Sequence, residues 1–241
     1  MQAVVPAAGR GSRLGALTAD RPKPLVPVAG TPLVEHVLDA LALPGVDGYV
    51  VVVGYRGERI RDHLGERYAG RPVEYAEQPA PVGLADALLR AEPAVDGPFL
   101  HCNGDNVFSA DLSRLVAHRE ATDADAVLLT ERVSAREARE TGVLVRDGGP
   151  DGDRLRVVEK PDDPPSTLVQ TGAFAFSPSV FDACRAVEPS ARGEYELSDA
   201  ITRLAREGRV ETLELGADEW RVNVNTAADI AAASRRLGAT Q

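Results

Sequence analysis

Short apolar runs alternate along the chain with segments of helical periodicity. Residues 3–7 and 48–54 are apolar runs rich in valine, which is typical of strands that are buried on both faces of a parallel sheet. Between them, residues 32–43 carry apolar side chains three or four positions apart, the spacing of one helix face. This order predicts βαβ units and hence an α/β fold.

The same periodicities predict the remaining elements. Further helices are expected over residues 56–68, 83–91, 179–187, 197–207 and 227–237. Further strands are expected over residues 73–76, 98–102, 126–129, 142–146, 155–159 and 168–176, with a hairpin or loop over residues 146–154. Helices become less frequent after residue 126, so we expect the second half to form a mixed-sheet cover over the first half.

Composition narrows the class of protein. A length of 241 residues suits one compact α/β domain. The net charge of -10 argues against a surface for nucleic acid or anionic membranes, because both need clustered positive charge. No run reaches the ~20 apolar residues of a membrane helix, and the first residues enter a strand at once, so we expect a cytoplasmic protein. Cys102 and Cys184 are too few for a disulfide framework and are expected to be buried thiols.

Lysine is almost absent from the chain. Lys23 and Lys160 are the only two lysines, and 25 arginines carry the rest of the positive charge. Both lysines lie beside proline, in Pro22-Lys23-Pro24 and in Lys160-Pro161. An ammonium is a compact point charge on a flexible stem, whereas a guanidinium is a planar fork. The two retained lysines are therefore candidate phosphate-binding residues.

A glycine-rich loop follows the first predicted strand, with the sequence Gly-Arg-Gly-Ser-Arg-Leu-Gly over residues 9–15. Its backbone amides can form an anion nest, and Arg10 and Arg13 add positive charge. The loop departs from the dinucleotide fingerprint because Leu14 takes the place of the third glycine, and it lacks the Gly-Lys-Ser/Thr of a P-loop. No acidic residue closes the second predicted strand, where Gly-Tyr-Arg follows Val53. A nicotinamide-dependent oxidoreductase is therefore the weaker alternative.

Two short motifs further along the chain complete a specific pattern. Pro-Lys-Pro-Leu stands at residues 22–25 and Gly-Thr-Pro-Leu at residues 30–33. Together with the glycine-rich loop they resemble the sugar-1-phosphate nucleotidylyltransferases, and the resemblance extends from residue 2 to about residue 230. It implies a Rossmann-like three-layer α/β/α nucleotide-diphospho-sugar transferase fold, with a mixed sheet and a sugar-binding elaboration in the second half.

The resemblance implies one nucleotidyltransferase domain over residues 1–241, in which residues 1–125 are mainly nucleotide-binding and residues 126–225 mainly sugar-binding. It also implies that a glutamine side chain and a glycine backbone contact the nucleobase, since a side-chain amide both donates and accepts hydrogen bonds. The implied nucleotide-binding residues are Ala8, Gly9, Gly11, Ser12, Arg13, Lys23, Gln78, Gly83 and Asp105.

For the sugar, the resemblance points to Glu-Lys-Pro at residues 159–161 and to Glu-Tyr-Glu-Leu-Ser-Asp at residues 194–199. The Glu159 carboxylate would accept from sugar hydroxyls while the Lys160 ammonium meets the sugar phosphate. Glu196 is either a further acceptor for a sugar hydroxyl or a cap for the helix that follows. The implied sugar-binding residues are Gly142, Glu159, Lys160, Thr171, Gly172 and Glu196.

The resemblance also implies a Mg²⁺ cofactor. Asp105, in Gly-Asp-Asn at residues 104–106, matches the position whose carboxylate holds the ion, a hard cation that prefers oxygen ligands. In Trp-Arg-Val-Asn-Val-Asn-Thr at residues 220–226, Asn223 stands where many relatives have a second metal-binding aspartate, and Asn225 replaces a glycine. Either Asn223 or Asn225 can supply the second ligand, and the lost negative charge is expected to weaken metal binding.

The implied reaction is the attack of a sugar 1-phosphate on the α-phosphate of a nucleoside triphosphate, with release of pyrophosphate. The nucleophile is already an anion, so positioning and charge neutralisation dominate. The elements around residues 159–161 and 192–196 look closest to short archaeal glucose-1-phosphate uridylyl- and thymidylyltransferases, which favours glucose 1-phosphate with UTP or dTTP. Asn223 keeps open a second hypothesis, a non-catalytic homologue that binds nucleotide sugars. The expected catalytic residues are Arg13, Lys23, Asp105 and Lys160.

Overall fold

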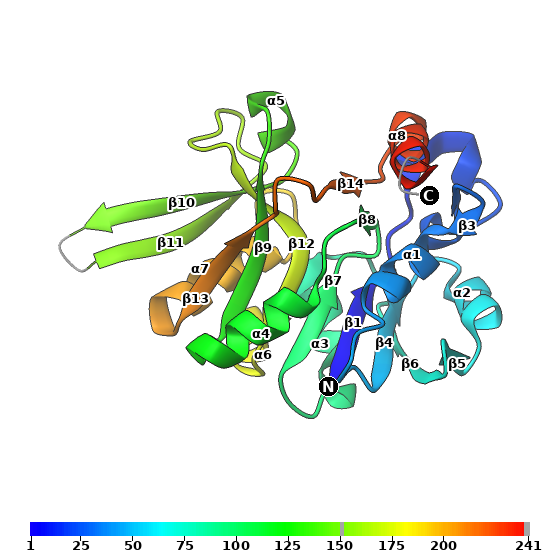
Figure 1. The fold of residues 1–241 in the computed structure, drawn as a ribbon, viewed down its shortest axis with the longest axis horizontal. Coiled ribbons are helices and arrows are strands. Elements are labelled where there is room, and N and C mark those ends of the chain that lie inside the picture. Colours follow the sequence, from blue (N-terminus) through cyan, green and yellow to red (C-terminus); the bar gives the residue numbers. More distant parts are fainter. Residues whose placement is uncertain (150–151, 239–241) are drawn as a thin grey trace.

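The structure, a computed structural model, describes residues 1–149 and 152–238. Its strands are β1 (Gln2–Pro6), β2 (Pro27–Val28), β3 (Thr31–Pro32), β4 (Gly48–Val53), β5 (Arg67–Tyr68), β6 (Arg71–Glu77), β7 (Phe99–Cys102), β8 (Asn106–Phe108), β9 (Ala126–Arg132), β10 (Gly142–Gly149), β11 (Gly152–Glu159), β12 (Leu168–Phe176), β13 (Val210–Glu214) and β14 (Arg221–Asn223). One ten-stranded sheet runs in the order β11-β10-β12-β7-β1-β4-β6-β5, and β9 and β13 join it through β12 (Figure 1). Beside it, β2 pairs with β3 and β8 pairs with β14.

Helices cover both faces of this sheet and give the predicted three layers (Figure 1). The α-helices are α1 (Leu33–Ala40), α2 (Gly57–Leu64), α3 (Leu84–Ala91), α4 (Ser113–Thr122), α5 (Ala135–Ala138), α6 (Ser179–Arg185), α7 (Leu197–Glu207) and α8 (Ala227–Gly238). The short 3₁₀ helices are η1 (Ser12–Thr18), η2 (Lys23–Leu25) and η3 (Glu92–Ala94). One core cluster contains residues of α3, α6 and α7, and a second contains residues of α1, α2 and α4.

The parallel strands are apolar on both faces because each face packs against one of these clusters. In β1, Val4 belongs to the cluster with α3, α6 and α7, whereas Ala3 and Val5 belong to the cluster with α1, α2 and α4. Successive side chains of a strand point to opposite faces, and those of β4 alternate between the two clusters in the same way. The valine-rich runs thus form doubly covered strands, and the predicted α/β fold class is confirmed.

The second half of the chain extends the sheet sideways. Strand β12 pairs with β7 in antiparallel register, with Ala173 opposite Cys102 and Phe176 opposite Phe99. Strands β9 and β10 pair with β12, which makes the sheet mixed. The prediction of a cover over the first half is wrong, because periodicity indicates which faces of a strand are buried and does not indicate its neighbour. The division into a nucleotide-binding part and a sugar-binding part stays a prediction.

Some predicted boundaries are also corrected. The prediction of one helix over residues 56–68 is wrong, because α2 ends at Leu64, where Gly65 takes a left-handed φ of 66°. The chain then continues as the antiparallel pair β5 and β6. The hairpin expected around residues 146–154 is formed by β10 and β11, and its residues 150–151 lie outside the described residues. Helix α4 and strands β8, β13 and β14 are additions that the periodicity did not predict.

The parallel part of the sheet gathers several loops at one edge. Strand β4 is parallel to β1 and β6, and β7 is parallel to β1. The residues that follow β1, β6 and β7 therefore meet beyond their carboxyl ends, where open α/β sheets bind ligands. Strands β8 and β14 pair near this edge, with Asn223 opposite Asn106 (Figure 1). Segments from the beginning, middle and end of the chain are thus brought together.

Two expectations from composition can be compared with the structure. Cys102 and Cys184 are both free and buried, as predicted. Burial raises the pKa of the Cys184 thiol to about 12. Within residues 1–149 and 152–238, no helix combines the length and the apolar character needed to cross a bilayer.

Asp125 joins three strands at the other end of the sheet. Its Oδ1 accepts hydrogen bonds from Ser177 Oγ (3.1 Å) and Ser179 Oγ (2.9 Å). Its Oδ2 accepts from the backbone amide of Arg209 (2.9 Å). These residues flank β9, β12 and β13. Burial acts to raise the pKa of Asp125, but the hydrogen bonds from Arg209, Ser179 and Ser177 outweigh it and hold the pKa below the ordinary value of 3.8.

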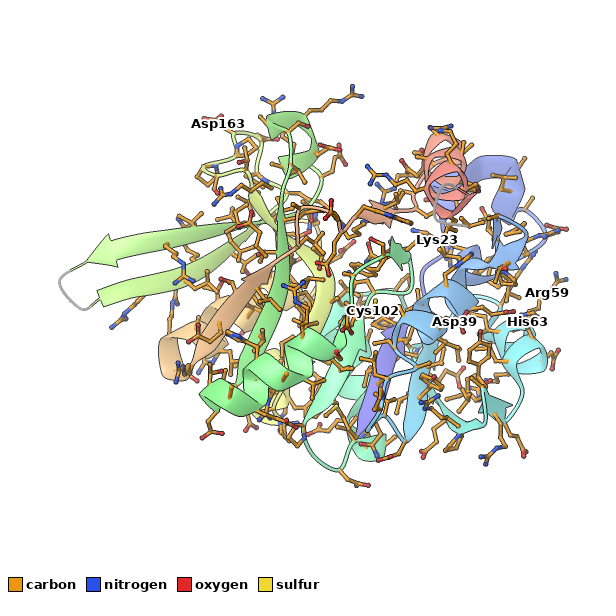
Figure 2. All side chains as sticks on the ribbon, in the orientation of Figure 1. Lys23, Asp39, Arg59, His63, Cys102 and Asp163 are labelled. Atoms are coloured by element: carbon orange, nitrogen blue, oxygen red, sulfur yellow. The ribbon has the colours of Figure 1, made fainter. Side chains whose placement is uncertain are left out.

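We predict that Asp125→Asn lowers the free energy of unfolding by about 1–2 kcal/mol near pH 7, because a side-chain amide cannot accept all three hydrogen bonds. A carboxylate whose pKa is depressed by folding stabilises the protein above its unfolded pKa and loses this effect as the pH falls through its folded pKa. The difference between wild type and variant should therefore shrink below pH 3.8. Urea unfolding at neutral and acidic pH measures it, with Asp163→Asn in an exposed loop as the control (Figure 2). An equal loss at both pH values would contradict this role.

Candidate active site

The first part of the site is the glycine-rich loop after β1. The Ala7 amide donates to the Val52 carbonyl (2.7 Å), which continues the pairing with β4 before the chain turns. Gly11 then takes a left-handed φ of 67° immediately before η1. A methyl group on Gly11 would lie 2.6 Å from Lys23 Cβ, so both the backbone conformation and the contact with lysine require glycine. The loop expected to bind phosphate thus also packs against one of the two lysines.

Lys23 lies beyond the carboxyl ends of the parallel strands (Figure 2). Its side chain is 11% exposed, and its Nζ donates to Asp105 Oδ2 (2.9 Å) and to Asn225 Oδ1 (2.9 Å). Arg13 Nη2 donates to the same Asn225 oxygen (3.0 Å). A buried ammonium is costly unless its charge and its hydrogen bonds are matched. Asp105 supplies the opposite charge, and one of the three N–H groups of Lys23 remains for a further acceptor.

Asp105 is held by backbone contacts with two distant segments. The Gly104 amide donates to the Pro6 carbonyl (3.1 Å), and a methyl group on Gly104 would lie 2.5 Å from that oxygen. The Asp105 carbonyl accepts from the Val224 amide (2.7 Å), which links it to the segment after β14. Within the part of the chain that the structure describes, the buried Asp105 Oδ1 has no hydrogen-bond partner. A buried carboxylate oxygen without a partner is a candidate cation ligand.

Gln78 follows β6 and is 4% exposed. Its Nε2 donates to the Gly83 carbonyl (3.0 Å) and to Asp86 Oδ2 (2.9 Å). Gly83 has a φ of 121°, and a methyl group there would overlap the Tyr195 carbonyl oxygen. The two residues predicted to contact a nucleobase therefore touch each other, and the segment around Tyr195 packs against them.

Glu159 and Lys160 lie at the end of β11. Ser198 Oγ donates to Glu159 Oε2 (2.6 Å), and Gln170 Nε2 donates to Ser198 Oγ (3.0 Å). Lys160 takes a left-handed φ of 43°, and its Nζ lies 3.4 Å from Glu159 Oε1. The side chain of Lys160 is 37% exposed, compared with 11% for Lys23. One lysine is thus enclosed, and the other reaches the surface of the site.

Glu196 stands at the N-cap position of α7, but its side chain does not cap the helix. Its Oε1 accepts instead from Ser190 Oγ (2.9 Å) and from Arg192 Nη2 (2.7 Å). Of the two roles expected for Glu196, the side-chain cap is therefore wrong. Burial raises the pKa of the neighbouring Asp199, and the charges of Glu196 and Glu159 raise it further. Three carboxylates thus lie close together on this side of the site, and Arg192 balances part of their charge.

Two adjoining cavities contain these side chains. The loop cavity, of about 340 Å³, opens beside the glycine-rich loop and Gln78. The strand cavity, of about 140 Å³, opens beside Glu159 and Gly172. The two cavities share seven wall residues, namely Arg13, Leu84, Asn103, Asp105, Lys160, Glu194 and Asn225. They therefore meet at the charged centre around Asp105.

All of the predicted site residues line these two cavities. The loop cavity is lined by Ala8, Gly9, Gly11, Ser12, Arg13, Lys23, Gln78, Gly83 and Asp105. The strand cavity is lined by Gly142, Glu159, Lys160, Thr171, Gly172 and Glu196, together with Asp105, Asn223 and Asn225. A larger cavity, of about 490 Å³, opens at the other end of the sheet beside Met1 and Phe99, and none of these residues lines it. The structure thus brings the predicted set together, and the contacts of each residue with a ligand stay predictions.

A buried ion pair in the wall of the strand cavity was not predicted. The side chain of Arg221 is 9% exposed, and its Nε donates to Glu131 Oε1 (2.7 Å) while its Nη1 donates to Asn106 Oδ1 (3.1 Å). Arg221 lies in the tryptophan-containing segment, but Glu131 is 90 residues away and no local motif marks it. The cavity residues Asn103 and Gln170 were also missed. Both stand directly beside predicted motifs, at residues 104–106 and 171–172.

The candidate metal ligands form a connected group. Asn225 Nδ2 donates to Asn223 Oδ1 (2.7 Å), and Asn225 Oδ1 accepts from the Lys23 ammonium, which also pairs with Asp105. Among the described residues, no three histidine, cysteine, aspartate or glutamate side chains converge. Asn225 Oδ1 already accepts from Lys23 and Arg13, so a cation at this centre would be held by one carboxylate and by the amide oxygen of Asn223. An all-oxygen donor set of this kind fits Mg²⁺.

Comparison with known sequences agrees with this arrangement. The chain matches the nucleotidyl transferase family over residues 2–235. It is 44% identical over 238 residues to the UTP–glucose-1-phosphate uridylyltransferase AglF of Haloferax volcanii, and this match covers 98% of this chain and 96% of AglF. It is 33% identical over 216 residues to the bifunctional protein GlmU of Methanocaldococcus jannaschii, and this match covers 89% of this chain and 49% of GlmU.

Solved structures share the fold. A Bacillus anthracis protein described as a glucose-1-phosphate thymidylyltransferase, in complex with sucrose, gives a TM-score of 0.86 at 25% identity, over 98% of this chain and 94% of that chain. A UDP-glucose pyrophosphorylase in complex with UDP-glucose gives a TM-score of 0.89 over 100% of this chain and 99% of that chain, and its 21% identity supports the fold alone. The Rossmann-like fold class is confirmed. The chain therefore belongs to the nucleotidyl transferase family and is a sugar-1-phosphate nucleotidylyltransferase, as its motifs predict.

Proposed function

We propose that the protein transfers the uridylyl group of UTP to glucose 1-phosphate and so forms UDP-glucose and pyrophosphate. The choice of substrates is supported by the 44% identity to Haloferax AglF over nearly the full length of both chains. The observation that carries the proposal is the charged centre of Lys23, Asp105 and Asn225, at which the loop cavity meets the strand cavity. One anionic substrate enters from each cavity, and the cations between them offset their repulsion.

The loop cavity suits a nucleoside triphosphate. Its polar end contains the amides of the glycine-rich loop together with Arg13 and Lys23, which are suitable partners for phosphate oxygens. A planar base needs apolar walls and a few polar groups that read its edge. The other end of the cavity supplies this combination through Gln78, Pro81, Gly83, Leu84 and Ala87.

The strand cavity suits the sugar phosphate. The carboxylates of Glu159 and Glu196 are acceptors for sugar hydroxyls, and Gly142 and Gly172 line the same cavity. Both glycines leave room for protein side chains, Gln170 beside Gly142 and Asn103 beside Gly172. Lys160 lines both cavities, so its ammonium can reach a phosphate that lies between them. The carboxylates thus face the neutral part of the substrate and the ammonium faces its charge.

In the proposed reaction, an oxygen of the sugar phosphate forms a bond to the α-phosphorus of UTP. The bond from this phosphorus to the bridging oxygen breaks, and the electron pair leaves with pyrophosphate. No covalent intermediate with the protein is required, and the attacking oxygen is already ionised, so the residues act through position and charge. Arg13 and the remaining N–H of Lys23 stabilise the charge that develops on the departing phosphates.

Mg²⁺ is the cofactor that we propose. Asp105 Oδ1, which has no partner among the described residues, and the amide oxygen of Asn223 are the donors that would hold it. Asn225 Oδ1 already accepts from Arg13 and Lys23, so of the two asparagines Asn223 is the better ligand. When bound, the ion would supply Lewis-acid neutralisation of the phosphate oxygens. Lys23 already pairs with Asp105 Oδ2 (2.9 Å), so the carboxylate can serve both cations, one through each oxygen.

The substrates are tested by measuring pyrophosphate release for each of UTP, dTTP, CTP, ATP and GTP with glucose 1-phosphate and with other hexose 1-phosphates. We expect the highest kcat/KM for UTP with glucose 1-phosphate. We expect dTTP to follow. It differs from UTP by a methyl group on the base and by the loss of one hydroxyl from the sugar, and these changes affect few contacts. A higher kcat/KM for any other pair would overturn the proposed substrates.

Lys23→Arg and Lys160→Arg should each lower kcat/KM about 100-fold or more, although both keep the positive charge. Lys23 is enclosed by Gly11, Asp105 and Asn225, and a planar guanidinium does not fit where a compact ammonium donates to two oxygens. A lost donor to the transition state is worth on the order of 3 kcal/mol. Arg21→Lys, a change of the same size at an exposed position, is the control. Near-normal kcat/KM in both lysine variants would show that the ammonium groups are not needed.

The proposed metal site predicts that two substitutions change the Mg²⁺ concentration needed for activity in opposite directions. Asp105→Asn removes the carboxylate and should raise the Mg²⁺ concentration for half-maximal activity about 10-fold or more. Asn223→Asp adds a negative charge beside it and should lower this concentration. Titration of activity with Mg²⁺, and calorimetric titration of Mg²⁺ into the protein with UTP bound, measure both effects. Full activity of the wild type in excess chelator would contradict the proposed cofactor.

A further inference from the structure

The orientation of the Gln78 side-chain amide is fixed by its neighbours. Its Nε2 donates to the Gly83 carbonyl (3.0 Å) and to Asp86 Oδ2 (2.9 Å). A carbonyl and a carboxylate can accept hydrogen bonds but cannot donate them. The end of the amide that faces Gly83 and Asp86 must therefore be the nitrogen, since the reversed amide would set its oxygen against two other oxygens.

The oxygen of the same amide is left for a ligand. Among the described residues, none donates to Gln78 Oε1, and this atom is not one of the fully buried polar atoms without partners. Gln78 lines the loop cavity and is 4% exposed, so its small accessible surface faces that cavity. Gln78 therefore presents a hydrogen-bond acceptor, and not a donor, to the loop cavity.

Asp86 is itself held in place. It lies in the first turn of α3, and its side chain is 16% exposed. Its Oδ1 accepts from Arg90 Nη2 (2.9 Å), one helical turn further along. Its Oδ2 accepts from Gln78 Nε2 (2.9 Å) and, at a longer distance, from Arg90 Nε (3.5 Å). Arg90 and the nitrogen of Gln78 present only donors to this carboxylate, so an amide in its place would set a donor against a donor.

We propose that Asp86 is a positioning residue for nucleobase selection, because it holds the acceptor end of Gln78 toward the loop cavity. This inference rests on the proposed use of UTP and adds the group that selects uracil over cytosine. Uracil presents an N3–H donor, which Gln78 Oε1 accepts. Cytosine presents a bare N3 acceptor at the same place, which Gln78 Oε1 repels. Asp86 does not touch the base and acts only through Gln78.

The test compares kcat/KM for UTP and CTP, with glucose 1-phosphate, in the wild type and in Asp86→Asn. In this variant the asparagine oxygen stays on Arg90, because Arg90 can only donate, and the asparagine nitrogen turns toward Gln78. In the original orientation the Gln78 nitrogen would then meet the asparagine nitrogen, so the reversed orientation, which presents nitrogen to the base, competes with the orientation that the Gly83 carbonyl favours. We expect the UTP to CTP ratio to fall about tenfold or more, the effect of exchanging one hydrogen bond for a mismatch, while the KM for glucose 1-phosphate stays unchanged.

Asp86→Ala is a second variant, in which the acceptor is removed and no donor replaces it. The ratio should fall by less than in Asp86→Asn, because the Gly83 carbonyl still favours the original orientation of the amide. Asp182→Ala is the matched control, since it removes an exposed aspartate that pairs with Arg185 on α6 as Asp86 pairs with Arg90 on α3. This control should keep the wild-type ratio even if it loses a similar amount of stability.

The outcomes separate this inference from the proposed function. A wild type that prefers UTP, together with Asp86 variants that keep its ratio within about twofold, would overturn the role of Asp86 and leave the proposed function intact. A wild type that uses UTP and CTP equally, or uses neither, would overturn both. A ratio that falls in Asp86→Asn, falls less in Asp86→Ala and stays constant in Asp182→Ala would support the inference.

Discussion

The site depends on the burial of one ammonium group between a carboxylate and an amide. A buried lysine is destabilising unless its charge is paired and its N–H groups find acceptors. Asp105 and Asn225 meet most of that requirement for Lys23, at 2.9 Å each. Among the residues that the structure describes, none accepts from the third N–H of Lys23 or donates to Asp105 Oδ1. The centre is therefore stable enough to fold and still has one donor and one acceptor for ligands, which in the proposed reaction are a phosphate and a cation.

The pairing of Lys23 with Asp105 is possible because the backbone brings their segments unusually close. Gly11 packs against the stem of Lys23, and Gly104 packs against the carbonyl of Pro6, at distances that exclude any side chain. The Asp105 carbonyl then binds the Val224 amide, which brings in the last segment of the site. Three stretches of chain that lie 82 or more residues apart in the sequence thus meet through close backbone contacts, and the polar side chains complete an arrangement that the glycines permit.

Most of the site could be predicted from the sequence, because its residues stand in short motifs. Lys23, Asp105 and Glu159 each follow from a few adjacent letters, and all line the two cavities. What could not be predicted depends on contacts across the chain. The antiparallel pairing of β12 with β7 and the ion pair between Arg221 and Glu131 leave no local pattern. The orientation of Gln78 likewise follows from Asp86, whose position on α3 gives no sign of this contact in the sequence.

An acidic protein can bind two polyanions because cations line the place where its two cavities meet. The net charge is -10, yet Arg13, Lys23 and Lys160 all line the loop cavity, and two of them also line the strand cavity. The carboxylates of Glu159 and Glu196 lie further along the strand cavity, where burial and their charges raise the pKa of Asp199. In the proposed complex they would face sugar hydroxyls, which are neutral donors, and not phosphate. Opposite charges attract most strongly at short range and in low dielectric. In the proposed complex these cations would therefore offset the long-range repulsion of the acidic surface, and the sugar phosphate would bind with its phosphate toward them.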